Sequence, residues 1–417
     1  MAARVRRPRA PEPALTERIL LLGDDIGVFL AVARSLGRRG AAVHVVAAEL
    51  DDPCLASRYI SAVHALPPYH RGAEAWLDAL RRLCDAQRFT LVIPCSDAGL
   101  QLLHKHRKTL GPERLLLPND AAFEAFTDKE ETRALAQRLG ISIASGRAAG
   151  TDADALAATL GLPLVLKPCR SYRPGAAETK QRAEVIRSLP RLRQALAQGR
   201  DAWLAESFVP GVGVGVSVLA ENGEILLAVQ HCRLQTLSET GGGSVRVTEA
   251  IDPVLAADVR QLAKAVSLTG VAMFEFRQDR DSRSHVLLEV NARFWGSLPL
   301  ALAAGADFPA GAWDVHRGRP VTRGQARIGV RKTNLAGELD RISTALKEGW
   351  GGTIGSMASL AGLIASLPFP ARFDSWAADD PAPWREERAI VVDRLKHSLP
   401  GLRGASPQRP AVRRPAT

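Results

Sequence analysis

The 417-residue chain lacks the cysteine patterns of a disulfide scaffold or a zinc site. It has only five cysteines, and no two of them form a CxxC pair. An odd, scattered set is typical of reduced thiols in a cytosol, since disulfide frameworks and zinc sites need closely spaced pairs. The first residues, MAARVRRPRAPEP, also lack the apolar stretch of a secretory signal. We therefore expect a cytoplasmic protein.

Lysine is scarce, with nine residues against forty-six arginines, and the formal net charge of +11 is unevenly distributed. Residues 1–18 carry a net +3 and residues 401–417 a net +4, so only +4 remains between them. Both ends are rich in proline and alanine without an apolar period, which predicts disordered basic tails at 1–17 and 401–417. Arms that bind anionic polymers are the alternative, but nothing else indicates a specific nucleic-acid partner.

Residues 349–371 contain no charged side chain and are long enough to cross a bilayer. They nevertheless include five glycines, three serines and two prolines, so the stretch is less apolar than a spanning helix. We expect no membrane span and predict a buried or partner-facing helix around 357–367.

An apolar run ending in glycine opens the folded part of the chain. RILLLG at 18–23 predicts a buried strand, residues 29–36 a helix, and AAVHVVAA at 41–48 a second strand. Strand, helix and strand at this spacing form a βαβ unit and imply a parallel sheet. Further helices are predicted at 75–83 and 99–108, and further strands at 90–95 and 114–118. Residues 18–118 thus predict a small doubly wound domain.

The first turn of this domain lacks the glycine spacing of a dinucleotide site. It is Gly23-Asp24-Asp25-Ile26-Gly27 rather than GxGxxG. Because two acids at this turn would also repel a phosphate, we do not expect nicotinamide or flavin binding.

The middle of the chain changes to an α+β pattern with antiparallel strands. Asn222-Gly223, between alternating apolar residues at 216–234, is a strong hairpin signal. Helices are predicted at 128–141, 189–197 and 254–267, strands at 163–168, 202–209, 271–279 and 284–294, a polar loop at 169–180 and a glycine-rich loop at 239–247.

Two of these strands carry carboxylates among apolar residues. Glu275 lies in MFEFR, while Glu289 and Asn291 lie two residues apart in LLEVNAR and hence on one strand face. Buried carboxylates need partners, and Mg²⁺ (or Mn²⁺) takes oxygen ligands from carboxylates, amides and phosphates. The alternative is that Arg277 and Arg293, in the same segments, neutralise the two carboxylates.

Two lysines are noticeable because lysine is rare here. Lys167 ends the apolar strand LVLKP, and Lys129 begins a predicted helix. A flexible ammonium at such a position suits a phosphate as a point-charge partner. The alternative, a surface lysine with a snorkelling stem, is the more usual case for Lys129 than for Lys167.

The segment AESFVPG at 205–211 places Glu206 near the end of a predicted strand, before a Pro-Gly turn. The backbone near Phe208 and Val209 could present N–H and C=O groups to the edge of an adenine ring. An ordinary exit from strand to loop has the same composition, so this segment alone is weak evidence.

Taken in order, these segments resemble the ATP-grasp superfamily. The resemblance covers roughly 18–320 and rests on DK, KP, ExFVPG, FEFR and LEVNARFWGS, after a domain similar to the N-terminal domain of biotin carboxylase and carbamoyl-phosphate synthase. It implies an α/β and α+β chain, in which the doubly wound domain precedes an ATP-grasp fold of two α+β subdomains at 119–320. The loop at 169–180 matches, in position only, the flexible loop that covers the phosphates.

The resemblance implies a nucleotide site between the two subdomains. Lys129 and Lys167 are expected to hold phosphates of ATP. Glu206 and the backbone near Phe208 and Val209 are expected to contact the adenine.

The resemblance also implies metal and catalytic roles. Glu275, Glu289 and Asn291 are expected to bind one or two Mg²⁺ (or Mn²⁺). Arg293 is expected to face the transferred phosphoryl group, so Arg293 and Lys167 are the candidate catalytic residues.

One departure concerns the ribose. Many members of the superfamily place an acid after this turn to hold the ribose hydroxyls, but GVGVGV at 211–216 has none. This relaxed GxGxG pattern is similar to stand-alone carboxylate–amine ligases. HCRL and GGGSV also resemble segments of those ligases. The candidates for binding the acid substrate are His231, Arg233, Gly242, Gly243 and Ser244. The alternative for these residues is a hairpin edge and a surface loop.

The resemblance therefore implies a C–N bond-forming ligase that uses ATP and magnesium. A substrate carboxylate would attack the γ-phosphorus to give an acyl phosphate, which an amine would then displace. The alternatives are an enzyme that phosphorylates bicarbonate or carbamate, and a non-catalytic ATP-binding protein.

Residues 321–400 are less informative. RIGVRKTNLAGELDRISTAL predicts a strand and an amphipathic helix within a C-terminal extension. The expected partners are a small-molecule carboxylate and an amine, and a homodimer is one assembly that the sequence permits.

Overall fold

The structure is a computed structural model, and it describes residues 17–23, 26–47, 52–67, 69, 73–170, 181–200, 203–238, 241–348 and 353–398. The predicted basic tails lie outside this part of the chain, apart from Glu17. Residues 171–180 of the predicted phosphate-covering loop and residues 239–240 also lie outside it. The described part is α/β and α+β, as predicted, with one parallel and two antiparallel sheets.

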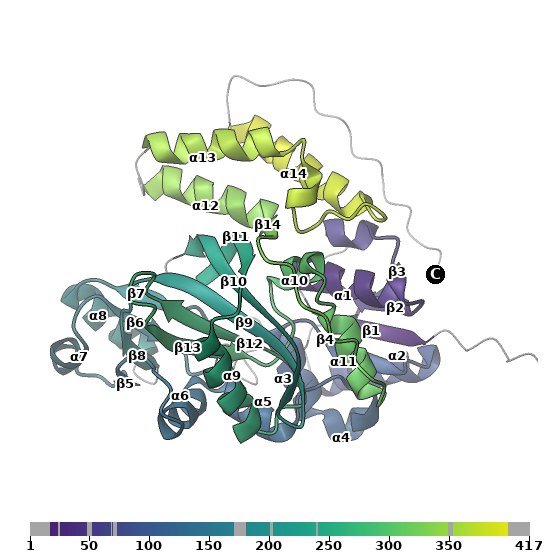
Figure 1. Ribbon diagram of the computed structural model, residues 1–417, viewed down its shortest axis with the longest axis horizontal. Coiled ribbons are helices and arrows are strands. Elements are labelled where there is room, and N and C mark those ends of the chain that lie inside the picture. The colour runs from purple at the N-terminus through teal and green to yellow at the C-terminus, as the bar shows by residue number, and fades with distance from the viewer. Residues whose placement is uncertain are drawn as a thin grey trace, which may run out of the picture.

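A four-stranded parallel sheet forms the N-terminal part, drawn in purple and blue in Figure 1. The strand order is β3 (Ile60–His64), β2 (Ala42–Val46), β1 (Arg18–Leu22) and β4 (Leu91–Pro94). One face packs against α1 (Ile26–Arg38), and the other against α2 (Ala73–Gln87) and α3 (Asp97–Lys105). Helices on both faces give the doubly wound arrangement that the apolar runs predict.

Two elements of this sheet differ from the prediction. The segment 114–118, predicted as a strand, makes a single bridge between Leu115 and Val92 after a 3₁₀ turn. Pro118 cannot donate to a ladder, which limits further pairing. The edge strand β3 was not predicted, because its residues alternate between half-buried and exposed and form no apolar run.

A six-stranded antiparallel sheet lies at the centre of the molecule (Figure 1). The strand order is β13 (His285–Asn291), β12 (Gly270–Gln278), β9 (Val212–Glu221), β10 (Glu224–Ser238), β11 (Gly241–Glu249) and β14 (Arg331–Thr333). The predicted hairpin is confirmed, since β9 and β10 meet at Asn222 and Gly223, whose φ angles of 50° and 83° suit a tight turn. One face packs against α5 (Asp120–Thr127), α6 (Lys129–Arg138) and α9 (Pro253–Ala265).

The opposite face of the central sheet joins it to the parallel sheet. There Met273 packs in one core with α1, α10 (Leu298–Ala304) and α11 (Phe308–His316), whereas Phe274 packs on the α9 side. Because side chains alternate along a strand, Glu275 lies on the same face as Met273. The fold therefore places the carboxylates of β12 and β13 on the face that meets the N-terminal part of the chain.

A smaller antiparallel sheet packs against α7 (Ala153–Leu160) and α8 (Leu189–Ala195). Its strand order is β5 (Gly146–Ala148), β8 (Leu204–Ser207), β6 (Leu164–Lys167) and β7 (Glu184–Ile186). The sequence predicts β6 and β8, in which apolar residues precede Lys167 and Glu206. The outer strands β5 and β7 have only three residues each and were not predicted.

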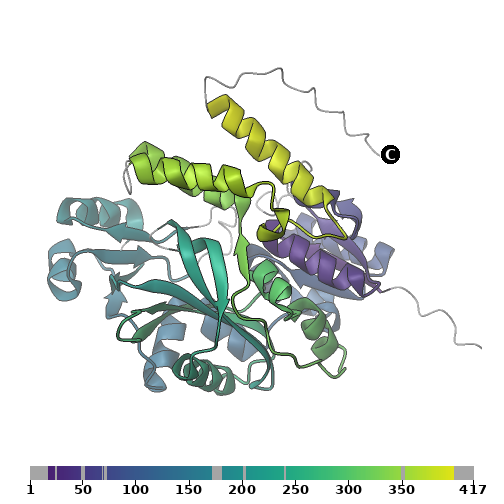
Figure 2. The same ribbon diagram turned by 45° about the horizontal axis from the view of Figure 1, so that its top comes forward.

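The C-terminal extension contributes β14 and three helices, α12 (Leu335–Glu348), α13 (Thr353–Ser366) and α14 (Ala382–Ser398), which lie together at the top of Figures 1 and 2. The predicted helix around 357–367 is largely within α13, in which Leu363 is buried and Met357 is exposed. None of the helices in the described residues combines the length and the apolar character that a membrane crossing requires. The domain boundaries at 18–118, 119–320 and 321–400 stay predictions.

Two buried ion pairs connect this extension to the rest of the chain. Asp380 accepts hydrogen bonds from Arg34 Nε at 2.9 Å and from Ser57 Oγ at 2.6 Å, and the charged pair is only 5% and 1% exposed. Arg246 of β11 pairs in the same way with Asp374. Because two charges have left water at each place, each depends on its partner for compensation.

We predict that Asp380→Ala destabilises the protein by about 3–5 kcal/mol, because it leaves the Arg34 guanidinium buried without its carboxylate. The neighbouring Asp379→Ala is a matched control, since its pair with Arg38 is 44% and 40% exposed. We expect the control to change stability by at most about 1 kcal/mol. Urea unfolding followed by fluorescence compares the two, and equal losses would contradict this account.

Candidate active site

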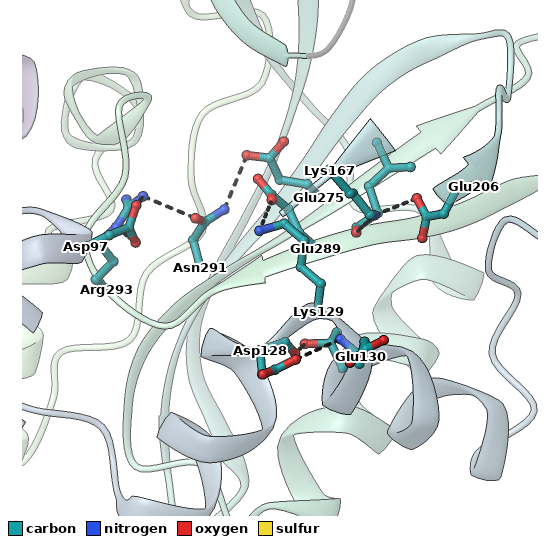
Figure 3. Close-up of polar contacts among 12 residues, drawn as sticks. Asp97, Asp128, Lys129, Glu130, Lys167, Glu206, Glu275, Glu289, Asn291 and Arg293 are labelled. Carbon is teal, nitrogen blue, oxygen red and sulfur yellow. Dashed lines mark hydrogen bonds and ion pairs between the residues drawn. The ribbon is translucent and has the colours of Figure 1, made fainter. Parts of the chain in front are cut away.

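The site is organised by the pairing of three strands. Glu275 of β12 lies directly opposite Glu289 of β13 on one side and Gly215 of β9 on the other. Side chains of directly paired residues leave the sheet on the same face, so the two carboxylates stand next to each other. Asn291, two residues after Glu289, extends the same face, as Figure 3 shows.

Each of these carboxylates has a basic partner from another element. Glu275 pairs with Arg233 of β10, and Asn291 Nδ2 donates to Glu275 Oε1 at 3.3 Å. Glu289 Oε2 lies 3.7 Å from Lys129 Nζ. The alternative ion pairs considered from the sequence, with Arg277 and Arg293, are thus not the ones described for these carboxylates.

Lys129 and Lys167 also set the charge of Glu289. Burial alone would raise the pKa of Glu289, but the two ammonium groups outweigh it and lower the pKa below the usual value. The carboxylate is therefore ionised at neutral pH. Two neighbouring carboxylates beside two lysines suit a cation bound together with phosphates.

A second group of charges lies between the central and the smaller sheet. Glu206 of β8 accepts from Lys167 Nζ and Arg133 Nη1, both at 2.5 Å, and its side chain is 5% exposed. Lys167 Nζ also donates to the carbonyl of Leu288 at 3.1 Å. Burial lowers the pKa of Lys167, while Glu206 opposes that shift. The Glu206 carboxylate is thus occupied by two cations, and Lys167 connects β6 to β13.

Arg133 was missed by the sequence analysis. It lies four residues after Lys129 on α6, so the two side chains share a helix face. That spacing is the signal that could have found it.

The two backbone positions predicted to meet an adenine follow β8. The amide of Phe208 already donates to the carbonyl of Pro163 at 3.3 Å, and the side chains of Phe208 and Val209 are half-buried. The structure therefore leaves Val209, rather than Phe208, as the candidate for an N–H contact to a base.

Arg293 points toward the parallel sheet. Its Nε and Nη2 donate to the two carboxylate oxygens of Asp97 at 2.6 and 2.8 Å, and Nη2 also donates to Asn291 Oδ1 at 3.1 Å. Figure 3 shows this chain of contacts running from Asp97 to Glu275. Asp97 was not predicted, although it follows the carboxyl end of β4, where ligand sites of parallel sheets gather.

A small hollow lies where these elements meet. Its walls include Asp97, Gln101, Lys129, Glu289 and Asn291. The hollow therefore borders Glu289, Asn291 and Lys129 on one side and the N-terminal part of the chain, with Asp97, on the other.

The residues predicted to bind an acid substrate are brought together in part. His231 of β10 lies opposite Gly215 of β9, and Gly215 in turn lies opposite Glu275 of β12. The three residues therefore form one row across the sheet. Burial, with the charges of Arg233 and Arg246, lowers the pKa of His231 to about 3, so this histidine is neutral at physiological pH. The guanidinium of Arg233 lies at Glu275 and is close to the metal candidates.

The glycine-rich segment predicted as a loop is a strand, because 241–249 forms β11. Gly242 and Gly243 lie at its start, and a Cβ on Gly243 would come within 3.0 Å of both Arg233 Cγ and Arg246 Cγ. Ser244 is fully buried and donates to Glu338 of α12 at 2.5 Å, so its hydroxyl serves the packing of the C-terminal extension.

The GVGVGV segment has a structural explanation. A Cβ on Gly213 would lie 2.9 Å from Arg233 Cδ, and one on Gly215 would lie 2.2 Å from His231 Cε1. The glycines therefore leave room for the Arg233 and His231 side chains to lie across β9.

Comparison with known proteins agrees with this architecture. Residues 200–336 match a family model described as ATP-grasp in the biosynthetic pathway with Ter operon. No curated protein sequence matches the chain.

Solved structures share the fold at low identity. Biotin carboxylase from Campylobacter jejuni matches with a TM-score of 0.58 and 18% identity, over 76% of this chain and 75% of that one. L-amino acid ligase from Bacillus licheniformis has a TM-score of 0.55 and 17% identity, with 74% and 75% covered. N5-carboxyaminoimidazole synthetase from Staphylococcus aureus has a TM-score of 0.56 and 16% identity, with 80% and 87% covered. The family match thus covers about a third of the chain, and the solved structures show a shared fold.

We predict that Gly215→Ala destabilises the protein by about 1–3 kcal/mol, because the new methyl group must displace the His231 ring from a packed position. Gly324→Ala is the matched control, since a Cβ there would meet no atom within 4 Å. Thermal unfolding compares the variants. A Gly215→Ala protein as stable as the control would show that the glycines are not needed for this packing.

Proposed function

We propose that this protein is an ATP-dependent ligase that joins a carboxylic acid to an amine through an acyl phosphate. The observation that carries the proposal is the cross-strand pair of Glu275 and Glu289, with Lys129 and Lys167 beside it. Phosphates bound with a divalent cation satisfy both halves of this arrangement, since the cation binds carboxylates and the lysines bind phosphate oxygens.

The donor set fits one or two Mg²⁺ (or Mn²⁺). Glu275, Glu289 and Asn291 offer carboxylate and amide oxygens, and magnesium commonly takes one or two carboxylates while phosphates and water complete its shell. Within the described residues, no three His, Cys, Asp or Glu side chains form a cluster that could hold a metal. When bound, the metal would neutralise charge that develops on the phosphate oxygens.

The remaining residues divide the work of binding ATP and the acid. Lys129 and Lys167 hold phosphate oxygens, and the backbone of Val209 borders the adenine. Glu206 acts by holding Lys167 in place. Arg233, with the neutral ring of His231 beside it, receives the substrate carboxylate.

The chemistry then proceeds in two displacements. A carboxylate oxygen attacks the γ-phosphorus, ADP leaves, and no general base is needed for this step. The amine nitrogen next attacks the acyl carbon and phosphate leaves. Arg293, which Asp97 and Asn291 hold next to the metal candidates, is the residue that we assign to the transferred phosphoryl group and to the oxyanion of the tetrahedral intermediate.

A second candidate is phosphorylation of bicarbonate, which is favoured by the biotin carboxylases among the similar structures. A non-catalytic ATP-binding protein is a third. The paired carboxylates of Glu275 and Glu289 argue against it, because a scaffold has no use for such a pair beside two lysines. Location in the cytoplasm and assembly as a homodimer are further proposals that rest on the sequence alone.

The experiment that tests the proposal is release of ADP from Mg·ATP in the presence of pooled carboxylic acids and amines. Release that requires both an acid and an amine would support the ligase, and dividing the pools would identify the substrates. Release with bicarbonate alone would favour the second candidate. Tight binding of Mg·ATP without any release would favour the third.

We predict that Glu289→Gln lowers ADP formation by about a hundredfold or more, because the variant loses a charged metal ligand. Glu224→Gln is the matched control, since Glu224 is 71% exposed in a surface pair with Lys264. Circular dichroism should show both variants folded. Full turnover in Glu289→Gln would exclude Glu289 as a metal ligand.

A further inference from the structure

The helix α13 has no charged residue on any side. It lies wholly within the uncharged stretch 349–371, and apart from one threonine and three serines its fourteen residues are apolar or glycine. A helix that is apolar all round is ordinarily buried all round, because none of its faces is suited to water. Here only one side of α13 is covered, so the other side requires an explanation.

The inner side of α13 packs on α12. Leu363 is buried in one cluster with Leu339 and Ile342 of α12, and Leu360 and Leu367 pack against the same cluster. These three leucines of the α13 segment recur at intervals of three and four residues, so they belong to a single face. Figures 1 and 2 both show α13 at the periphery of the molecule, next to α12.

The outer side of α13 is apolar and exposed. Met357, Ala361 and Ile364 share one face at intervals of four and three residues, and all three are exposed, Met357 to 59%. A Cβ on Gly362 would meet no atom of the described residues within 4 Å, so the helix is open there. Single exposed apolar side chains are ordinary, but a whole uncharged helix face is typical of a binding surface.

Positive charge adjoins this face. Residues 394–417 contain six lysine and arginine residues and no acid. This basic segment begins near the end of α14, where Leu395 packs against the same cluster as Leu360. Just beyond α13, Phe369 is exposed and the Arg372 guanidinium lies 5.6 Å from its ring centre.

The charges distinguish between two kinds of cover. A second copy of the chain would bring another basic segment next to the first, and like charges repel. One helix face ~21 Å long is also small against the roughly 800 Å² per partner that stable interfaces bury. A surface of anionic lipids suits both features, since apolar side chains enter the boundary between headgroups and acyl chains while arginines attract the headgroups.

We propose that the outer face of α13 binds the surface of an anionic membrane. Met357 and Ile364 enter its apolar boundary, and the basic segment 394–417 is attracted to the lipid phosphates. The helix lies on the membrane and does not cross it. This proposal goes beyond the ligase function and does not depend on it, because membrane binding is measured without ATP.

Met357→Glu tests the helix, since it places a charge on the apolar face without removing a buried side chain. Flotation with vesicles of equal parts phosphatidylglycerol and phosphatidylcholine measures binding by the full chain. We expect wild-type protein to bind these vesicles and Met357→Glu to bind them about tenfold more weakly. Val254→Glu is the matched control and should bind like wild type, since Val254 is 58% exposed and lies in α9, far from α13 in Figures 1 and 2.

A second full-length variant tests the basic segment. It combines Arg403→Gln, Arg409→Gln, Arg413→Gln and Arg414→Gln. Each arginine near an anionic surface contributes roughly fivefold in affinity, so we expect this variant to bind the mixed vesicles about tenfold more weakly or worse. Vesicles of phosphatidylcholine alone carry no net charge and should bind the wild-type protein weakly. Equal binding to both kinds of vesicle would contradict the role of charge.

The remaining outcomes separate a membrane from other covers. Wild-type protein that does not float with the mixed vesicles would overturn the proposal, and so would equal binding by wild type and Met357→Glu. Light scattering addresses a second copy, because a dimer that Met357→Glu converts to a monomer would show that this face joins two chains. ADP release remains the test of the ligase, so the two proposals can fail separately.

Discussion

The structure depends on one buried carboxylate, that of Glu206. It binds Lys167 of β6 and Arg133 of α6, and Lys167 in turn reaches the carbonyl of Leu288 in β13. None of these charges could stay buried without the others, because removing one leaves the rest uncompensated. The contact fixes the smaller sheet against the central one. It also holds α6 so that Lys129, at the start of that helix, lies beside Glu289.

The strands of the site could be predicted because their side chains alternate with a period of two. That periodicity is enough to place Glu289 and Asn291 on one face, and the hairpin at Asn222 follows from turn chemistry. The strand β11 was mistaken for a loop because its first residues are glycines. Those glycines occur in a strand because side chains from β10 and β11 fill the space above them, which local sequence does not reveal.

The partners of the site residues could not be predicted from the sequence. Asp97 and Arg293 are 196 positions apart, and Arg133 and Glu206 are 73 apart. Such pairs depend on how three sheets meet rather than on a local pattern. The sequence analysis instead offered arginines on the same strands as partners for Glu275 and Glu289, since only near neighbours are visible without a fold.

The strand β14 has a consequence for solubility. It pairs with β11 over Val245, Arg246 and Val247, at the edge of the central sheet. Without this short cover, β11 would present unpaired N–H and C=O groups, which are a template for a strand from another chain. The ion pair between Arg246 and Asp374 holds the chain beyond β14 against the same edge. The C-terminal extension thus closes the sheet against edge-to-edge aggregation, so its removal would expose the edge of β11 even if every residue around Glu275 and Glu289 stayed intact.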